Sequence, residues 1–366
     1  MTIGYGFEID FLPVGNGDNS GDAIALRYGE SGNYKIMVYD GGTKEAGEQL
    51  VDHIQTYYGT TFVDDVVCSH PDADHASGLS VVLERLDVGT LWMNRPWNYS
   101  AAILDYFKDG RITDDSLVER LKKKMSAAYE LEKIAKESGV PIKDPFQGQK
   151  IGEFVVLSPE EEWYIHELIA DFEKSPDKKS PGTVQQATRY LTEAARKVIS
   201  WVTELWHQES LREDVETSAE NESSVVLFAQ LDGSGVLLTG DAGLQALHAS
   251  ADFTEGLGFD MPANLLFAQI PHHGSRHNVS TSVLDRLVGL RKEANDGISA
   301  KIAYVSAGKE STSHPRKMVL NAFIRRGCSV VSTKGRSIWY SKNMPGRTNW
   351  GPVTPHAFSE RVEAWD

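Results

Sequence analysis

The segment Ser69-His70-Pro71-Asp72-Ala73-Asp74-His75 constrains this chain more than any other, because it places four side chains able to bind a metal within six residues. The apolar run 63–68 precedes it and predicts a buried strand. In an extended chain alternate side chains point the same way, so His70, Asp72 and Asp74 would share a face, with His75 beside them. Imidazole and carboxylate bind Zn, Mn and Fe. An Asx turn with a helix cap would explain the aspartates but not both histidines. We therefore predict a metal site at a strand end.

The composition is typical of a globular protein. Of 366 residues, 40% are apolar and 32 are glycine, which fits a fold with many turns. We expect no membrane span, because no run of eighteen apolar residues occurs, and no signal peptide at residues 1–8. Cys68 and Cys328 both lie in apolar runs, which predicts reduced core thiols and a cytoplasmic location.

The charge is unevenly distributed along the chain. The formal net charge is −15, which argues against a surface coated for nucleic acid. Residues 271–350, however, carry fourteen Lys and Arg against four Asp and Glu. Two interpretations stay open: this basic segment forms a field that attracts an anionic substrate to one face, or its charges are scattered and solvated.

Short strands with helices between them are predicted over residues 1–95 and 221–345. The clearest hairpin surrounds Asp232-Gly233-Ser234-Gly235, between strands 225–231 and 236–239. Further strands are predicted at 7–13, 23–28, 34–39, 63–68, 264–270, 301–306 and 328–332. Helices are predicted at 45–57, 79–86 and 316–326.

Residues 96–220 have a different, charged and helical character. Helical spacing is predicted at 103–107, 116–138 and 160–219, the last broken at 175–176 and 180–181, around one short strand near 151–159. Aromatic residues at helical spacing indicate a core or an interface more often than a ligand site. We interpret 96–220 as a largely helical insertion that covers the site or mediates assembly, as a homo-oligomer or with a protein partner.

Polar side chains recur where predicted strands end. Asp40 follows strand 34–39, Asp241 follows strand 236–239, and His272 and His273 follow strand 264–270. Singly, such residues are ordinary turns, caps or surface groups. Their order along the chain, completed by His314, favours one shared site.

These motifs resemble the metallo-β-lactamase superfamily, and in particular its ComEC-type branch, the soluble domain of DNA-uptake competence proteins and related hydrolases. The resemblance covers about 8–83 and 221–340. It rests on Val14-Gly15-Asn16-Gly17-Asp18, Val38-Tyr39-Asp40-Gly41-Gly42, the segment 69–75, Asn221-Glu222-Ser223-Ser224, Leu238-Thr239-Gly240-Asp241, Pro271-His272-His273-Gly274-Ser275 and Ser313-His314-Pro315.

The resemblance implies an α+β fold, a four-layer αββα metallo-β-lactamase sandwich with a helical insertion. Residues 1–95 and 221–345 would form the hydrolase domain, 96–220 the insertion and 346–366 a C-terminal tail.

The resemblance also implies two divalent metal ions, zinc or manganese. His70 and Asp72 would hold one ion, Asp74 and His75 the other, and Asp241 would bridge them. Either His272 or His273 would be a further ligand, and that choice stays open. The remaining site positions are expected to orient ligands or to contact substrate: Asp18, Asp40, Asn221, Ser223, Ser224, Ser275, Arg276 and Lys334.

The family's usual third histidine of the first metal is missing, and Asn221, Ser223 and Ser224 stand near its place. The site is therefore richer in oxygen, which helps manganese to compete with zinc. The implied activity is that of a phosphodiesterase or nuclease that cleaves DNA or RNA with a metal-activated hydroxide. Proton transfer would fall to Asp74, Asp241, His272 or His314. Two alternatives stay open: hydrolysis of a small ester, lactone or cyclic nucleotide, and a non-catalytic binding subunit with a degenerate metal site.

Overall fold

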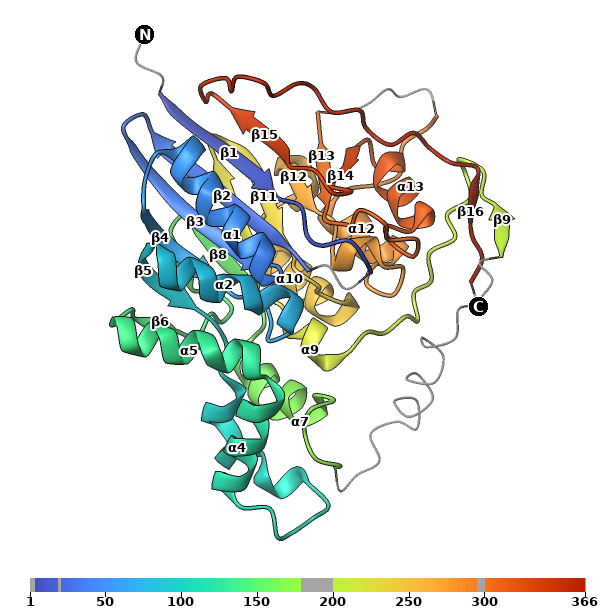
Figure 1. The fold of residues 1–366 in the computed structure, drawn as a ribbon. Coiled ribbons are helices and arrows are strands. Elements are labelled where there is room, and N and C mark those ends of the chain that lie inside the picture. Colours follow the sequence, from blue (N-terminus) through green and yellow to red (C-terminus); the bar gives the residue numbers. More distant parts are fainter. Residues whose placement is uncertain (1–3, 19–20, 179–199, 295–299, 366) are drawn as a thin grey trace.

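Two seven-stranded sheets form the centre of the molecule (Figure 1). The structure is a computed structural model that describes residues 4–18, 21–178, 200–294 and 300–365. The first sheet has the order β15-β1-β2-β3-β4-β5-β6, antiparallel from β15 to β3 and parallel from β3 to β6. Its strands are β1 (Tyr5–Phe11), β2 (Ala23–Glu30), β3 (Asn33–Gly41), β4 (Phe62–Val67), β5 (Asp87–Trp92), β6 (Ile142–Lys143) and β15 (Ile338–Lys342).

The second sheet has the order β14-β13-β12-β11-β10-β8-β7 and is parallel from β11 to β14. Its strands are β7 (Lys150–Ile151), β8 (Phe154–Ser158), β10 (Val226–Leu231), β11 (Ser234–Leu238), β12 (Leu265–Gln269), β13 (Ile302–Val305) and β14 (Ser329–Ser332). The predicted hairpin is confirmed: Asp232 and Gly233 form its two-residue turn with φ of 48° and 69°. Positive φ at both positions is what a type I′ turn requires.

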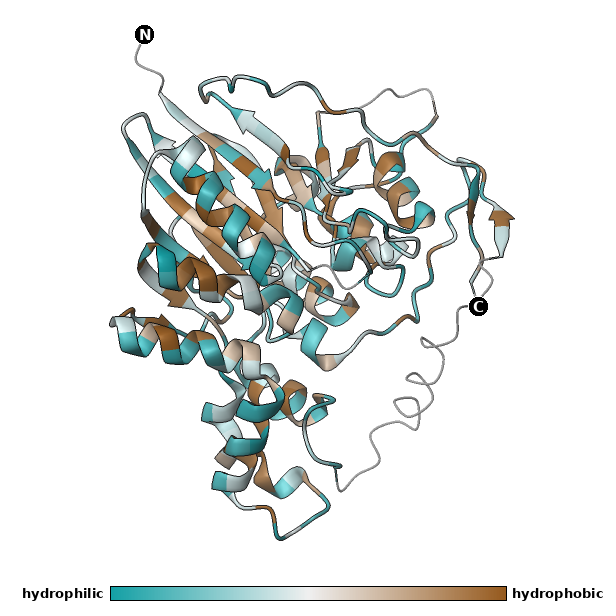
Figure 2. Ribbon diagram, viewed as in Figure 1, coloured by the Kyte–Doolittle hydropathy of each residue, from teal (hydrophilic) through white to brown (hydrophobic). Residues whose placement is uncertain are grey.

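Apolar side chains divide the molecule into four layers. Residues from both sheets, among them Phe11, Tyr39 and Phe267, form one core between the sheets. A second core packs the first sheet against the helices α1 (Lys44–His53), α2 (Ala73–Arg85) and α5 (Ser126–Ser138). A third packs the second sheet against α10 (Leu244–Gly256), α12 (Thr281–Leu287) and α13 (Lys317–Arg325). Figure 2 shows the resulting concentration of apolar residues in the strands and on the inner helix faces. The predicted α+β, αββα architecture is confirmed.

The segment that follows β5 extends below the two sheets in Figure 1. Its predicted helix 116–138 is two helices, α4 (Asp114–Lys124) and α5, because Met125 leaves the helical conformation between them. Shorter helical pieces complete it: η2 (Pro96–Tyr99), α3 (Ser100–Ile103), η3 (Leu104–Tyr106), α6 (Glu161–Trp163), η4 (Tyr164–Leu168) and α7 (Ile169–Asp171).

The helix predicted over 160–219 is wrong for much of its length. In residues 160–178 helical structure ends at Asp171, residues 179–199 lie outside the described residues, and 201–203 form the strand β9 (Trp201–Thr203). This strand pairs with β16 (Arg361–Glu363), a partner far along the chain that local spacing cannot reveal. A short helix, α9 (Ala219–Glu222), leads back into the second sheet.

The C-terminal residues pack against the body of the molecule. Val362 in β16 is fully buried, and the Glu363 carboxylate accepts a hydrogen bond of 2.9 Å from the backbone N–H of Lys317. The C-terminal part is therefore integrated into the layer around α13. Nowhere in the described residues is a helix both long and apolar enough to cross a bilayer.

Candidate metal centre

The candidate site lies where strands of both sheets end. Asp40 is the next-to-last residue of β3, and Ser69 and His70 follow the neighbouring parallel strand β4. In the second sheet, Asp241 follows β11 and His272 follows its parallel neighbour β12. The carboxyl ends of parallel strands lie at one edge of a sheet, so each sheet brings its polar residues to a single edge.

Asp241 is the centre on which the histidines converge. Its Oδ2 atom lies 3.3 Å from Nε2 of His75, 3.8 Å from Nε2 of both His272 and His273, and 3.9 Å from Nε2 of His70. The Asp241 side chain is almost completely buried. The structure therefore brings together residues that lie up to 203 positions apart between His70 and His273.

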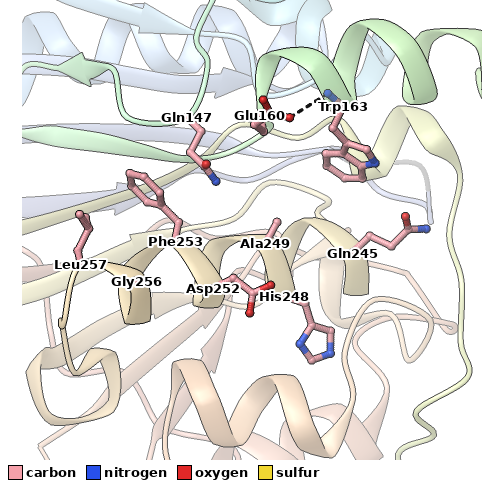
Figure 3. Close-up of a pocket in the computed structure, with 10 residues that line it drawn as sticks. All are labelled: Gln147, Glu160, Trp163, Gln245, His248, Ala249, Asp252, Phe253, Gly256 and Leu257. Atoms are coloured by element: carbon pink, nitrogen blue, oxygen red, sulfur yellow. Dashed lines mark hydrogen bonds between the residues drawn. The ribbon is translucent and has the colours of Figure 1, made fainter.

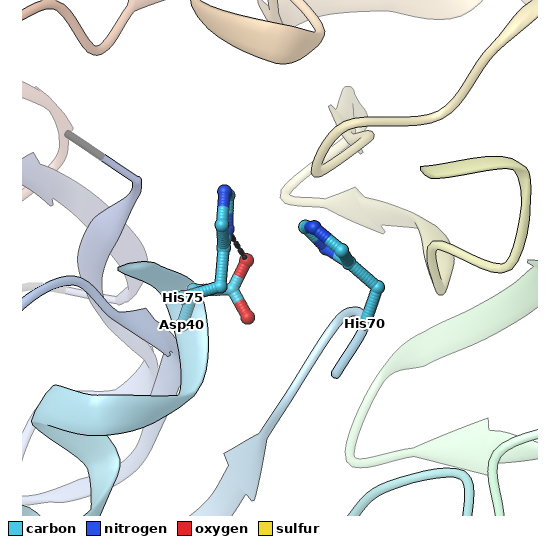
Figure 4. Close-up of side chains that lie close together, drawn as sticks. All are labelled: Asp40, His70 and His75. Atoms are coloured by element: carbon cyan, nitrogen blue, oxygen red, sulfur yellow. Dashed lines mark hydrogen bonds and ion pairs between the residues drawn. The ribbon is translucent and has the colours of Figure 1, made fainter. Parts of the chain in front are cut away.

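Asp40 orients His75 through a hydrogen bond to Nδ1, which Figure 4 shows, whereas Asp241 faces Nε2 of the same ring. Its buried carboxylate accepts hydrogen bonds from the N–H (2.7 Å) and hydroxyl (2.6 Å) of Ser69, and its Oδ2 lies 2.9 Å from Nδ1 of His75. Asp40 adopts a φ of 58°, which turns the chain sharply at the strand end. A Cβ at Gly78 would lie 1.8 Å from the carbonyl of the residue after Asp40, so only glycine lets α2 approach this closely. The arrangement fixes which imidazole nitrogen of His75 faces Asp241.

The donor set fits a divalent cation. With a proton on Nδ1, held by Asp40, His75 turns Nε2 toward the Asp241 oxygen, and either a second proton or a metal cation must lie between these two atoms. Nε2 of His70, Nε2 of His75 and Oδ1 of Asp241 are buried and have no hydrogen-bond partner within the described ranges. Buried polar atoms without partners are rare in folded proteins and often indicate an ion. Three sets of donor atoms lie within 4.8 Å of one another: Asp40, His70 and His75; Asp74, His75 and His273; and Asp22, His75 and Asp241.

Burial and charge set the protonation of these groups. Burial lowers the pKa of His70 and of His273, which keeps both imidazoles neutral, the form that binds a metal. Burial alone would raise the pKa of Asp241, but His75, His272 and His273 hold it well below the usual range. Burial alone would lower the pKa of His75, but Asp241 and Asp40 hold it well above the usual range, so a metal that binds here would displace a proton from this imidazole.

The metal loop is less extended than its sequence predicts. Helix α2 begins at Ala73, six residues before the predicted start, so Asp74 and His75 lie in its first turn. Asp74 is partly exposed and joins the group around His75 and His273. The side chain of Asp72 is 31% exposed, with Oδ2 3.7 Å from Nε2 of His70 and Oδ1 in an ion pair with Lys174.

His272 and His314 form the outer part of the site. Their rings are stacked, with centroids 6.2 Å apart and 19° between the planes, and His272 is 28% exposed. The Nδ2 atom of Asn221 lies 3.0 Å from Nδ1 of His272. The Ser311 hydroxyl donates to Asp18 and accepts from the His314 N–H, so Asp18 holds the loop that carries this histidine. Both His272 and His273 approach Asp241 equally, and the geometry leaves both as candidate ligands.

The three predicted serines stabilise backbone around the site. The Ser224 hydroxyl accepts a 3.2 Å hydrogen bond from the N–H of Asp241, and Ser223 donates to the carbonyl of Glu220. Ser275 accepts from a backbone N–H two residues later. These contacts shape the loops that carry the candidate ligands.

The cations predicted to contact substrate face the protein backbone. Arg276 donates to the carbonyl of Ala364 and lies over the ring of Trp365, 4.6 Å from its centroid. Lys334 donates to the carbonyls of Ser311 (2.7 Å) and His314 (2.9 Å). Lys334 therefore supports the His314 loop, and Arg276 contacts the C-terminal residues.

Much of the basic segment 271–350 is neutralised by acidic residues from elsewhere in the chain. Arg325 pairs with Glu204 at 2.9 Å, and Arg326 pairs with Glu209 at 2.8 Å. Arg347 is buried against Asp10 and Glu8, inside a group of aromatic rings that includes Trp339 and Trp350. These cations lie in the interior, so neither a directed basic face nor a set of solvated charges describes them.

Sequence reasoning missed Asp22. Its Oδ2 lies 4.0 Å from Nδ1 of His75 and accepts a 2.8 Å hydrogen bond from Gln269. Burial raises the pKa of Asp22 to about 7. A signal was available, because β2 is antiparallel to β3, and the residue that precedes β2 therefore lies beside the end of β3 that carries Asp40.

A separate cavity of about 670 Å³ lies between α10 and the residues around β7 and α6 (Figure 3). Trp163 and Phe253 contribute its aromatic surface and His248 its imidazole. None of the predicted site residues lines it.

Comparisons with known proteins assign neither a family nor an activity to this chain. No protein-family model and no curated protein matches the chain. Among solved structures, a diphosphatase from the PhnP family is 12% identical, with 92% of this chain and 98% of that chain covered and a TM-score of 0.34. A putative metallo-β-lactamase from Thermotoga maritima is 10% identical (64% and 78% covered, TM-score 0.30), and a long form RNase Z from yeast is 11% identical (96% and 39% covered, TM-score 0.33). Scores of this size establish no kinship, so the fold assignment rests on the four layers described above.

Proposed function

We propose that this protein is a divalent-metal-dependent hydrolase that cleaves phosphodiester bonds, with DNA or RNA as substrate. The observation that carries the proposal is the convergence of four imidazole Nε2 atoms within 3.9 Å of one buried Asp241 oxygen. Hydrogen bonding within the protein leaves Nε2 of His70 and His75 to a ligand.

The residues divide into two groups of proposed metal ligands. His70 and Asp72 would hold an ion on one side of Asp241. The other side would use Asp74, His75 and His273, with Asp22 close by. Bound zinc or manganese ions would supply an activated water and polarise a phosphoryl oxygen.

The outer histidines, His272 and His314, would orient the substrate and protonate the leaving group. Burial, with His272 and His273 nearby, lowers the pKa of His314 to about 3, so its imidazole is neutral near pH 7. A neutral His314 can orient a substrate oxygen by a hydrogen bond but does not donate a proton readily. We therefore assign proton donation to His272, which stacks on His314 and is partly exposed.

A second candidate is the hydrolysis of a small ester, lactone or cyclic nucleotide. It is favoured by the interior position of Arg325, Arg326 and Arg347, because a long polyanion is normally held by a track of exposed cations.

Hydrolysis assays distinguish these candidates. Purified protein with Mn²⁺ or Zn²⁺ would be incubated with single-stranded DNA, duplex DNA, RNA, a cyclic nucleotide and bis-(p-nitrophenyl) phosphate, beside an Asp241→Asn control. We expect polynucleotide cleavage that the substitution abolishes and that weakens steeply as salt rises. Cleavage of the small substrates alone would select the second candidate. Activity that survives the substitution would contradict the assigned site.

A further inference from the structure

Lys174 places a fixed positive charge beside one half of the candidate metal centre. Its ammonium forms an ion pair with Oδ1 of Asp72, 102 positions earlier in the chain. It follows α7 and belongs to the helical segment below the two sheets.

The backbone that carries Lys174 is firmly anchored. Phe172 is buried, with its ring centroid 6.2 Å from that of Tyr164 in the core of the segment. Arg120 donates to the carbonyls of Lys174 (3.0 Å) and Ser175 (3.4 Å), and the Ser175 hydroxyl donates to the carbonyl of Ile169. A lysine on a fixed turn loses less conformational entropy when its ammonium reaches a partner. The fold therefore holds the backbone of Lys174 in the position from which its ammonium contacts Asp72.

Asp72 is shared between this lysine and the metal centre. One carboxylate oxygen contacts the ammonium, and the other lies 3.7 Å from Nε2 of His70. A cation near His70 would have to share the carboxylate with an existing positive charge and would be repelled by it. On the other side of the centre, Asp241 is surrounded by imidazoles, which become neutral ligands when a metal binds.

We propose that Lys174 makes the two halves of the centre unequal, because its ammonium competes with a divalent ion for Asp72. The half built from His70 and Asp72 then binds its ion much more weakly than the half around His75 and His273. This inference rests on the proposed metal-dependent function. The helical segment thereby sets the affinity of the second ion through the charge that Lys174 places at Asp72.

Glu220 offers the ammonium a second partner. It is 1% exposed, and neither of its carboxylate oxygens has a hydrogen-bond partner in the part of the chain that the structure describes. It lies near enough to Lys174 and Asp72 to interact electrostatically with both. When an ion takes Asp72, the ammonium would still be attracted electrostatically by Glu220.

Calorimetric titration of chelator-treated protein with Mn²⁺ measures the two affinities without reference to activity. In the wild type we expect one tight ion and a second at least tenfold weaker. Lys174→Met, which keeps the apolar stem and removes the charge, should tighten the weaker ion at least tenfold and leave the tighter one within twofold. Lys178→Met is the matched control: Lys178 pairs with Asp171 in the same segment and is 24% exposed, against 27% for Lys174. It should change neither affinity.

Two further variants separate charge from packing. Lys174→Arg keeps the charge and should retain the wild-type difference between the ions; a tenfold tightening in this variant would overturn the proposal. Glu220→Gln should weaken the second ion in the wild type and have little effect in Lys174→Met, where no ammonium needs the second partner. Unchanged or weakened binding in Lys174→Met would also overturn the proposal. A wild-type protein that binds no divalent ion would instead refute the proposed function.

Discussion

Asp40→Asn tests whether the orientation of His75 controls metal binding. The carboxylate accepts three hydrogen bonds, from the N–H and hydroxyl of Ser69 and from Nδ1 of His75. An amide in the same position has one acceptor and one donor. With the amide NH₂ toward the Ser69 N–H, two donors oppose each other. With it toward His75, the imidazole must move its proton from Nδ1 to Nε2, and the lone pair that faces Asp241 disappears.

The magnitude follows from these two arrangements. A buried donor left unsatisfied costs about 1–3 kcal/mol, so the metal-free variant should be less stable by that amount. Groups that hold a ligand imidazole in place typically contribute 10–100-fold to metal affinity. We therefore expect a 10–100-fold weaker ion, equivalent to about 1.4–2.8 kcal/mol.

Urea unfolding of chelator-treated protein and calorimetric metal titration measure the two effects separately. Asp64→Asn is the matched control, because Asp64 accepts hydrogen bonds from the N–H of Ile36 and from Lys35 at the other end of the same sheet. It should leave metal affinity unchanged. Wild-type metal affinity in Asp40→Asn would refute the orienting role.

Two more predictions concern charge. In Asp241→Asn, metal affinity should fall at least 100-fold. Chelation removes about 2.7 kcal/mol of stability from wild-type protein saturated at 100 times its Kd. In the variant, calorimetry should show that chelation leaves the melting temperature unchanged. Arg347→Met removes the arginine that pairs with buried Asp10, while Glu8 keeps its ion pair with Arg27, and should cost about 3–5 kcal/mol at pH 7. Burial alone would raise the pKa of Asp10, but His53 and Arg347 lower it. The stability that the ionised Asp10 provides is present above about pH 4 and is lost as the pH falls further. Urea titrations should therefore show the variant approaching the wild type below about pH 4.

Local sequence patterns were sufficient to predict where several strands end. Short apolar runs followed by Asp40, His70 and Asp241 predict strands that stop at polar residues, because alternation and turn residues are properties of neighbouring positions. The order of these motifs favours one site, and the family resemblance that they carry implies the αββα layers. The start of α2 was misplaced by six residues, since Asp72 before Ala73 resembles loop and helix start equally well.

Contacts between distant segments lay beyond local reasoning. The strand Trp201–Thr203 exists because it pairs with residues 361–363, and no helical or extended preference at either end reveals the other. The same holds for the excess charge of 271–350: Arg325 meets Glu204, 121 positions earlier, and is buried, whereas the sequence alone indicates an exposed cation. The ion pair between Lys174 and Asp72, 102 positions apart, is another long-range contact that local patterns do not reveal.

The centre spans two sheets, so its geometry depends on how the sheets are held together. Asp40 and His70 come from the first sheet, whereas Asp241 comes from the second. Two hydrogen bonds join the sheets next to the site: the Tyr39 hydroxyl donates to the carbonyl of Val225 at 2.7 Å, and the N–H of Val225 donates to the carbonyl of Ser69 at 2.9 Å. A shift between the sheets would break these bonds and separate the imidazoles of His70 and His75 from Asp241, which shares its sheet with His272 and His273. The core between the sheets therefore supports the candidate metal centre directly, and the fold and the site are specified by the same contacts.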